Sequence, residues 1–249
     1  MSDTFFRGAG PLISIILPSR GRSAHLLESL RSLYSTAIDR SQLEFLLKID
    51  EDDTESQEVA KQAAQESGCV IKMWTSPRGN GYRDFHHWIN SLAGVAEGDW
   101  LFLFNDDARM KTQGWDYGVL NAPLSKVWHK LSEVCIVVIS TIGRPAANEF
   151  PLIRRDIYKI LGHLSLNPHV DNWIHTVVFP LGCAYRFPEQ FAIEHPTIDS
   201  EDVVRRETME AYQSTDIEYH SAPMIRARLQ DSLKLLDYIE KHMKGENEN

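Results

Sequence analysis

Acidic and amide side chains gather directly after a short apolar run near the middle of the chain. The run Trp100–Phe104 has the length of a buried strand, and it ends on Asn105, Asp106 and Asp107. Polar side chains at the carboxyl end of a strand lie where open α/β sheets bind ligands. Adjacent carboxylates repel each other unless a cation or hydrogen-bond donors offset their charge. The pattern indicates a divalent metal held by oxygen atoms with positions left for phosphate; a local turn, which Asn and Asp also favour, is the alternative.

Charged side chains also follow the other strands that we predict in the first half of the chain. The carboxyl ends of parallel strands meet at one edge of a sheet, so these side chains should lie near the acidic stretch. Arginines offer planar donors suited to phosphate oxygens, and carboxylates can contact a base, a ribose or a metal. Together they predict a nucleotide-phosphate and metal site formed by Arg20, Arg22, Asp50, Asp52, Asp53, Arg78, Arg83, Asn105, Asp106 and Asp107.

Strand and helix patterns alternate along this part of the chain. Short apolar runs predict strands, and apolar residues at helical spacing predict helices between them. The alternation is typical of parallel βαβ units, so we predict an α/β fold with a mostly parallel central sheet flanked by helices. The predicted strands are residues 13–17, 44–49, 70–74 and 100–104. The first predicted helix is capped by Ser23, the second covers 54–67 and ends at Gly68, and the third covers 84–96.

The alternation becomes less regular after Asp107. Val134–Thr141 predicts a strand, and Phe150–Leu161 predicts a turn followed by a helix. Three short strands are predicted at 177–180, 183–187 and 191–194. From Pro223 onward, apolar residues recur at helical spacing with charges on the other face, which predicts an amphipathic helix. We therefore expect a main domain over residues 1–220 and a C-terminal helix and tail over 221–249.

The composition is that of an ordinary globular protein, with 43% hydrophobic and 24% charged residues among 249. A formal net charge of −9 argues against a general nucleic-acid-binding protein, which would need a basic face. Cys69, Cys135 and Cys183 form no CxxC pair and suggest reduced thiols rather than a disulfide or zinc framework. No apolar run has transmembrane length and the N-terminus lacks a signal-peptide pattern, so we expect a cytoplasmic protein.

The common nucleotide-binding motifs are missing from the sequence. There is no GxxxxGK[ST] phosphate loop, and no GxGxxG pattern follows the first predicted strand. Gly79 and Gly81 have the first spacing of that pattern but lack its third glycine. A calcium loop that begins at Asp50 would need glycine where Glu55 stands. These absences exclude the P-loop and dinucleotide-binding classes as explanations of the charged clusters.

In combination, the segments resemble family 2 glycosyltransferases of the GT-A fold. The matching parts are Pro18–Arg22 after the first strand and Asp50–Asp53 after the second. They are followed by the helix carrying Asn90, by Ala96–Trp100 and by Asn105–Asp107. Each motif is weak by itself, and the specificity comes from their order and spacing over roughly the first 110 residues.

The resemblance implies that residues 1–110 form a donor half that binds a nucleoside-diphosphate sugar, with UDP as the commonest donor type of the family. It adds Pro18 and Ser19 to the donor-binding residues and places Asp50 at the nucleobase. Residues 105–107 stand where the family carries an Asp-x-Asp motif. Because Asn105 replaces the first Asp of that motif, Asp107 is the expected direct ligand of Mn²⁺ or Mg²⁺.

The resemblance also covers an acceptor half over residues 111–220, though less closely. Phe150–Ile153 and Val170–Ile174 match its acceptor-side segment, where inverting members carry an acidic general base. Asp171 is the candidate for that base, and a helix cap is its alternative role. His195 resembles the late histidine that completes the metal shell in many GT-A enzymes. A sugar-stacking face could come from Trp88, Trp115 or Trp173, although core packing is the commoner use of Trp.

Two other functions stay open from the sequence. A sugar-phosphate nucleotidyltransferase of similar fold is disfavoured because its glycine-rich opening loop is not evident at Pro18–Arg22. A catalytically silent module that binds a glycan or a partner is kept open by Asn105 in the metal motif. The acceptor is an unidentified glycan or other hydroxyl compound. The C-terminal helix is expected to pack on its own domain, with a homo-oligomer contact as the alternative.

Overall fold

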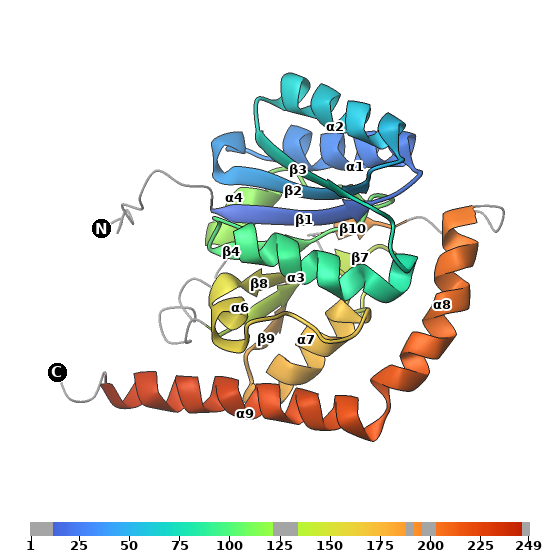
Figure 1. Cartoon of the computed structure of the whole chain (residues 1–249). Helices are drawn as coiled ribbons and strands as arrows, with labels where there is room; N and C mark the ends of the chain where they lie inside the picture. Colours follow the sequence, from blue (N-terminus) through green and yellow to red (C-terminus); the bar gives the residue numbers. More distant parts are fainter. Residues whose placement is uncertain (1–11, 122–133, 188–191, 196–202, 246–249) are drawn as a thin grey trace, which may run out of the picture.

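The chain folds around a seven-stranded, mostly parallel sheet flanked by helices (Figure 1). This computed structural model describes residues 12–121, 134–187, 192–195 and 203–245. The strands follow the order β3–β2–β1–β4–β8–β6–β9, in which the first four are parallel and β8 runs antiparallel to both of its neighbours. Their bounds are β1 Ile13–Ser19, β2 Leu43–Asp50, β3 Val70–Ser76, β4 Trp100–Leu103, β6 Ile136–Val138, β8 Pro151–Arg154 and β9 Ala184–Arg186.

A second, three-stranded sheet brings the late part of the chain to the end of β4. In the order β5–β10–β7, strand β10 lies antiparallel to β5 and parallel to β7. This pairing sets Glu194 opposite Arg109, two residues after Asp107, and so carries His195 to the acidic stretch. The bounds are β5 Arg109–Met110, β7 Ser140–Thr141 and β10 Ala192–Glu194.

Helices cover the sheet and extend beyond it at the C-terminal end. In Figure 1, α1 and α2 lie together beside the β1–β2–β3 edge, whereas α8 and the long α9 form an outer arm around the other half. The helices are α1 Ser23–Thr36, α2 Thr54–Ser67, α3 Phe85–Val95, α4 Trp115–Asn121, α6 Arg155–Leu161, α7 Val170–Val178, α8 Val203–Tyr219 and α9 Ala222–Gly245. Short 3₁₀ turns are η1 Arg40–Gln42, η2 Gly81–Asp84 and η3 Phe179–Leu181.

The central strands are buried on both faces, as parallel strands covered by helices must be. All eight residues of β2 and all four of β4 are buried, including the polar Glu44 and Lys48. Glu44 accepts hydrogen bonds from Ser14 Oγ and from the backbone of Glu97 and Gly98. A Cβ on Gly98 would lie 2.7 Å from the Ser14 backbone nitrogen, so only glycine fits this approach of the chain to β1.

The structure confirms the predicted strands and helices of the first half. The helix over 54–67 ends at Gly68, whose φ of 67° is the left-handed conformation that glycine adopts most easily. One detail was wrong: Ser23 is the first residue of α1 and Arg22 occupies the cap position, with no capping side-chain hydrogen bond. The Ser23 hydroxyl instead donates to Glu55 of α2.

The second half required more corrections. Val134–Thr141 is divided between β6 and β7, which belong to different sheets. Phe150–Leu161 contains the strand β8 as well as α6, because Pro151–Arg154 pairs with both β4 and β6. The strand predicted over 177–180 was wrong, since these apolar residues end α7 and form η3. Helix α8 was not predicted. The strands predicted over 183–187 and 191–194 are confirmed as β9 and β10, and the C-terminal helix is confirmed as α9. In the described part of the chain, no helix is long and apolar enough to span a bilayer.

Candidate active site

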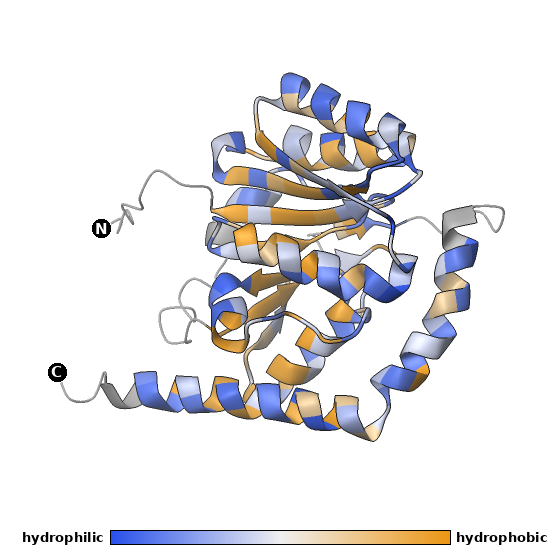
Figure 2. Cartoon of the chain, viewed as in Figure 1, coloured by the Kyte–Doolittle hydropathy of each residue, from blue (hydrophilic) through white to orange (hydrophobic). Residues whose placement is uncertain are grey.

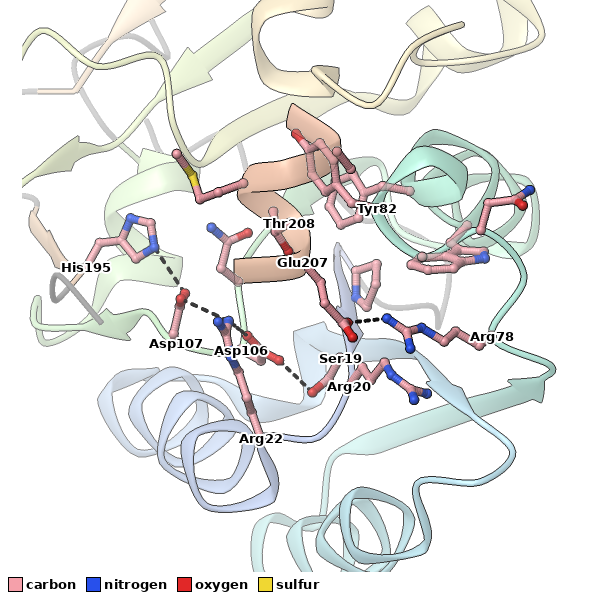
Figure 3. A pocket seen from close by; sticks show the side chains of 18 of the residues that line it. Ser19, Arg20, Arg22, Arg78, Tyr82, Asp106, Asp107, His195, Glu207 and Thr208 are labelled. Carbon is pink, nitrogen blue, oxygen red and sulfur yellow. Dashed lines mark hydrogen bonds and ion pairs between the residues drawn. The ribbon is translucent and has the colours of Figure 1, made fainter. Parts of the chain in front are cut away.

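A cavity of about 520 Å³ opens at the carboxyl ends of β1 and β4. Its floor comes from the segments that follow these strands, and η2, α3 and α8 form other walls (Figure 3). The arrangement agrees with the rule that open α/β sheets bind ligands beyond the carboxyl ends of their strands. The lining includes Pro18, Ser19, Arg20, Arg22, Arg78, Asn80, Tyr82, Trp88, Asn105, Asp106, Asp107, Arg144, His195, Glu207, Thr208 and Met209.

The acidic stretch forms a turn that presents two carboxylates to this cavity. The Ala108 backbone N–H donates to the Asn105 carbonyl at 3.2 Å, which closes the turn. Asp106 and Asp107 are each 8% exposed, and both line the cavity. A local turn and a ligand site were alternative interpretations of this stretch. The two are compatible, because the turn directs both carboxylates into the cavity.

Arg22 and Ser19 offset the charge of the two carboxylates. One guanidinium nitrogen of Arg22 lies 3.4 Å from Asp106 Oδ1 and 3.3 Å from Asp107 Oδ2, and Ser19 Oγ donates to Asp106 Oδ2 at 2.7 Å (Figure 3). Arg22 reaches this point because it precedes the first turn of α1. An internal cation thus holds the acidic pair together.

The two carboxyl groups differ in acidity. Burial, reinforced by the neighbouring charge of Asp107, raises the pKa of Asp106 to about 6. Burial also acts on Asp107, but its hydrogen bond with His195 outweighs that effect and holds its pKa below the usual range. The site therefore contains one firmly ionised carboxylate, Asp107, and one whose charge depends on its surroundings.

His195 completes the acidic end of the cavity. Its Nε2 lies 3.0 Å from Asp107 Oδ1, while its Nδ1 lies 3.5 Å from Glu149 Oε2 and 2.9 Å from an Arg144 nitrogen. Burial opposes the charged ring, yet hydrogen bonds with the two carboxylates raise the pKa of His195 to about 9. The ring also meets Phe150 edge to face at 5.3 Å.

Phe150, which contacts His195, has an unusual backbone conformation. Its φ is 56°, and among the described residues it is the non-glycine residue with positive φ. Such strain persists where surrounding contacts fix it, and it clusters at functional sites. Glu149, one residue earlier, accepts from Thr141 Oγ1 at 2.9 Å and from Arg144 at 2.8 Å. The result is a rigid support behind the His195 ring.

The donor atoms at this end fit a divalent cation. Within the residues that the structure describes, no group of three or more His, Cys, Asp or Glu side chains is arranged as a complete metal site. Asp107 would offer one carboxylate oxygen, and His195 would offer one imidazole nitrogen once a bound cation displaced its proton; the two atoms lie 3.0 Å apart. Neighbouring ligands of an ion bound at about 2.1 Å lie at roughly this separation, and Mg²⁺ commonly takes one or two protein ligands plus phosphate and water.

The carboxylates after β2 do not line the cavity. Asp50 is 1% exposed, and its two oxygens accept from Lys48 and Arg20. Asp52 accepts from Arg20 at 2.9 Å, and Asp53 accepts from the Gly21 backbone at 2.6 Å while capping α2. These groups influence the cavity by fixing the chain at Arg20 and Gly21. Direct contact of Asp50 with a nucleobase stays a prediction.

Aromatic side chains also line the cavity. The Trp88 ring lies in α3 and lines the cavity, and the buried Lys48 ammonium stands 4.3 Å from its centroid. Arg78 pairs with Glu207 of α8, and both line the cavity (Figure 3). Arg83 is exposed and is not among the lining residues. The contribution of α8 to the cavity was not predicted, because Glu207 lies in a segment whose apolar residues have only a weak helical pattern.

Asp171 lies in a smaller adjoining cavity of about 160 Å³. It stands in the first turn of α7, and burial raises its pKa above the usual range. Its position inside the helix excludes the N-cap role, which His169 occupies. The two cavities share Tyr82, Phe85 and Asn105; the smaller is also lined by Ile89, Leu103, Phe104, Glu149, Phe150, Pro151, Pro168 and Val170.

Comparisons with known proteins identify the fold. No protein-family model and no curated protein sequence matches the chain. Among solved structures, a mannosyltransferase from Pyrobaculum calidifontis in complex with GDP-Man and Mn²⁺ is similar, with a TM-score of 0.62 at 15% identity over 92% of this chain and 75% of that one. TarS from S. aureus in complex with UDP-GlcNAc gives a TM-score of 0.61 at 11% identity over 90% of this chain and 71% of that one.

The chain shares a GT-A-like fold with this mannosyltransferase and with TarS. At such low identity the likeness concerns the fold alone, because one fold can carry several functions. It confirms the predicted α/β class with a mostly parallel sheet and C-terminal helices. The function has to be argued from the side chains of the site.

Proposed function

We propose that the protein is a glycosyltransferase that moves a sugar from a nucleoside-diphosphate sugar to a hydroxyl acceptor. The observation that carries the proposal is one cavity lined by a carboxylate and imidazole pair, by arginines and by an aromatic ring. Asp107 and His195 form the pair, Arg22 contacts Asp107, and Arg20 and Trp88 line the same cavity. These groups match the needs of a metal-bound diphosphate and of a nucleoside.

In this proposal Asp107 and His195 hold Mn²⁺ or Mg²⁺. The ion would supply positive charge to the departing diphosphate. The guanidinium of Arg22 offsets the charge repulsion between Asp106 and Asp107. From the same wall of the cavity it would also donate hydrogen bonds to the phosphates. Glu149 and Arg144 fix the orientation of the His195 ring. The Mn²⁺ in the similar mannosyltransferase complex supports this assignment.

Asp171 is the proposed general base. Its carboxylate faces the smaller cavity, which adjoins the donor cavity through Tyr82, Phe85 and Asn105. An acceptor hydroxyl bound there would lose its proton to Asp171 as its oxygen attacks the anomeric carbon and the bond to the diphosphate breaks. Burial makes this carboxylate a stronger base than an exposed Asp. Attack opposite the leaving group corresponds to an inverting reaction.

The proposal can be tested by calorimetric titration of UDP, GDP and CDP, each with and without Mn²⁺ or Mg²⁺. We expect one nucleotide to bind in a metal-dependent manner, with UDP favoured as the commonest donor type of the family that the sequence resembles. Absence of binding by all three would contradict the proposal and favour a silent glycan-binding or partner-binding module. Release of pyrophosphate from a nucleoside triphosphate and a sugar phosphate would identify a nucleotidyltransferase instead.

Replacing Trp88 by alanine should weaken nucleoside-diphosphate binding but leave metal-dependent pyrophosphate binding unchanged. Stacking of a base on an aromatic ring contributes about 1–3 kcal/mol, so we expect a loss of roughly 5- to 150-fold in affinity for the nucleotide. Trp88→Phe keeps an aromatic face and should retain most of the affinity. Titration of both ligands into both variants provides the measurement. Equal losses for nucleotide and pyrophosphate would show that Trp88 supports the fold of the site rather than the base.

A further inference from the structure

Helix α9 exposes a stripe of four large aliphatic side chains. Ile225, Leu229, Leu233 and Leu236 are 43%, 59%, 64% and 38% exposed. Their spacing of four, four and three residues places them on one face of a helix. Apolar residues recur along α9 in Figure 2. Single exposed leucines are ordinary, but an aligned set on one face marks an interaction surface. We call these four residues the outer stripe.

The outer stripe cannot turn inward, because the other face of α9 is fixed to the domain. The Arg228 guanidinium lies 3.8 Å from the Tyr219 ring centroid and donates to the Tyr219 carbonyl at 2.9 Å. Asp231 accepts from Trp173 Nε1 at 3.0 Å, and Ser232 Oγ donates to the Val177 carbonyl at 2.9 Å. Three side chains thus lock the inner face against α7 and the end of α8. The expected packing of this helix on its own domain is observed, and it leaves the four side chains of the outer stripe between 38% and 64% exposed.

We propose that the outer stripe binds the outer stripe of a second copy of the chain, with the two α9 helices antiparallel. Arg226 and Asp237 flank the outer stripe near its two ends, about three turns apart, and therefore lie on the same edge of the helix. A two-fold axis midway between them sets Arg226 of one copy opposite Asp237 of the second copy, twice per dimer. A parallel pair would instead place this edge of the two copies on opposite sides of the contact, so that the charges would not pair, and it would align the helix dipoles unfavourably.

The apolar contacts agree with this register. Leu229 and Leu233 lie on either side of the midpoint. Leu229 of one copy therefore lies near Leu233 of the second copy across the two-fold axis, and the reverse contact forms as well. Asp237 also accepts from Lys241 within its own helix at 2.6 Å, an exposed pair of small energy that leaves its other oxygen available. The helix of 24 residues extends over about 36 Å, long enough for a continuous helix–helix contact.

The proposal is tested by light scattering after size exclusion and by sedimentation of the full chain over a concentration series. We expect a dimer for the natural sequence and a monomer for the double variant Leu229→Glu/Leu233→Glu. Ile217→Glu is the matched control, because Ile217 is 75% exposed on α8 and lies outside the outer stripe. It should remain dimeric. Circular dichroism and the thermal unfolding midpoint of each variant show that the domain is folded.

A charge exchange tests the orientation. Arg226→Glu should raise the dimer dissociation constant at least about tenfold, and Arg226→Glu/Asp237→Arg should restore it, because the opposed pairs are re-formed with reversed sign. Failure of the double variant to recover would overturn the antiparallel register. A monomeric natural chain at tens of micromolar would overturn the dimer, and binding of that monomer to anionic vesicles through the same leucines would assign the outer stripe to a membrane surface. None of these outcomes depends on the sugar-transfer proposal.

Discussion

Replacing Asp107 by alanine is expected to abolish metal-dependent nucleotide binding while leaving the fold intact. Asp107 is the carboxylate held ionised next to His195, and its oxygen lies 3.0 Å from the imidazole nitrogen that would share the ion. Loss of one of two protein ligands should lower the affinity for Mn²⁺ by more than the roughly 10- to 100-fold that follows from loss of a supporting side chain. Calorimetric titration of UDP, GDP and CDP with and without Mn²⁺ gives the measurement.

The fold of the Asp107→Ala variant should be preserved for an electrostatic reason. Removing one carboxylate relieves its repulsion with Asp106, and Arg22 keeps Asp106 as a partner. Glu58→Ala is the matched control, since Glu58 is an exposed carboxylate of α2 that pairs with Lys61 and is not among the residues lining the cavity. Its metal-dependent binding should equal that of the natural sequence. If Asp107→Ala binds nucleotide with the same metal dependence, the ion is held elsewhere and the assignment is wrong.

Replacing Asp171 by asparagine should keep donor affinity and remove transfer. The two side chains have nearly the same shape, but asparagine cannot accept the proton of the attacking hydroxyl. General base catalysis contributes about 10²–10⁴ in rate, and we expect a loss of that size. Because no acceptor is identified, hydrolysis of the nucleotide sugar, with water as acceptor, is the practical assay. Titration of the nucleoside diphosphate into the same variant gives the donor affinity.

The pH dependence separates a base from a structural role for Asp171. Burial raises its pKa, so its basic form is lost as pH falls through a value above the usual range of Asp. Hydrolysis by the natural sequence should therefore decline on the acid side in that range. The residual rate of Asp171→Asn should lack this decline. An Asn variant with full activity would place the base on another group, and Glu149 lines the same small cavity.

The strands and helices of the first half of the chain were predicted well because their signals are local. Apolar runs that end on polar clusters define β1, β2 and β4, and the left-handed Gly68 ends α2 as expected. The meeting of Asp107 and His195 was implied by resemblance alone, since the strand pairing that creates it joins distant segments. Burial of Asp50 was not foreseen. Lys48, two residues earlier, points to the same side of β2, and its ammonium binds the carboxylate that was expected to face a base.

The second half was harder because its pairing is non-local and its apolar residues lack a clear period. Nothing in Pro151–Arg154 distinguishes a strand from the start of a helix until β4 and β6 are placed on its two sides. Helix α8 was missed because its exposed residues outnumber its buried ones over the part whose side chains are described. Yet this helix supplies Glu207, Thr208 and Met209 to the cavity, so the missed element forms part of the site.

The pairing of β10 with β5 also has a consequence for the order of folding. Asp107 and His195 are separated by 88 positions, and a two-residue ladder of β10 on β5 brings them together. Closing so long a loop is entropically unfavourable, and contacts of this kind form late. The sheet of β1 to β4 can assemble from neighbouring segments as the chain is synthesised. The corner where Asp107 meets His195, by contrast, can form only after residue 195 has emerged, so we expect it to form late rather than to act as a nucleus of folding.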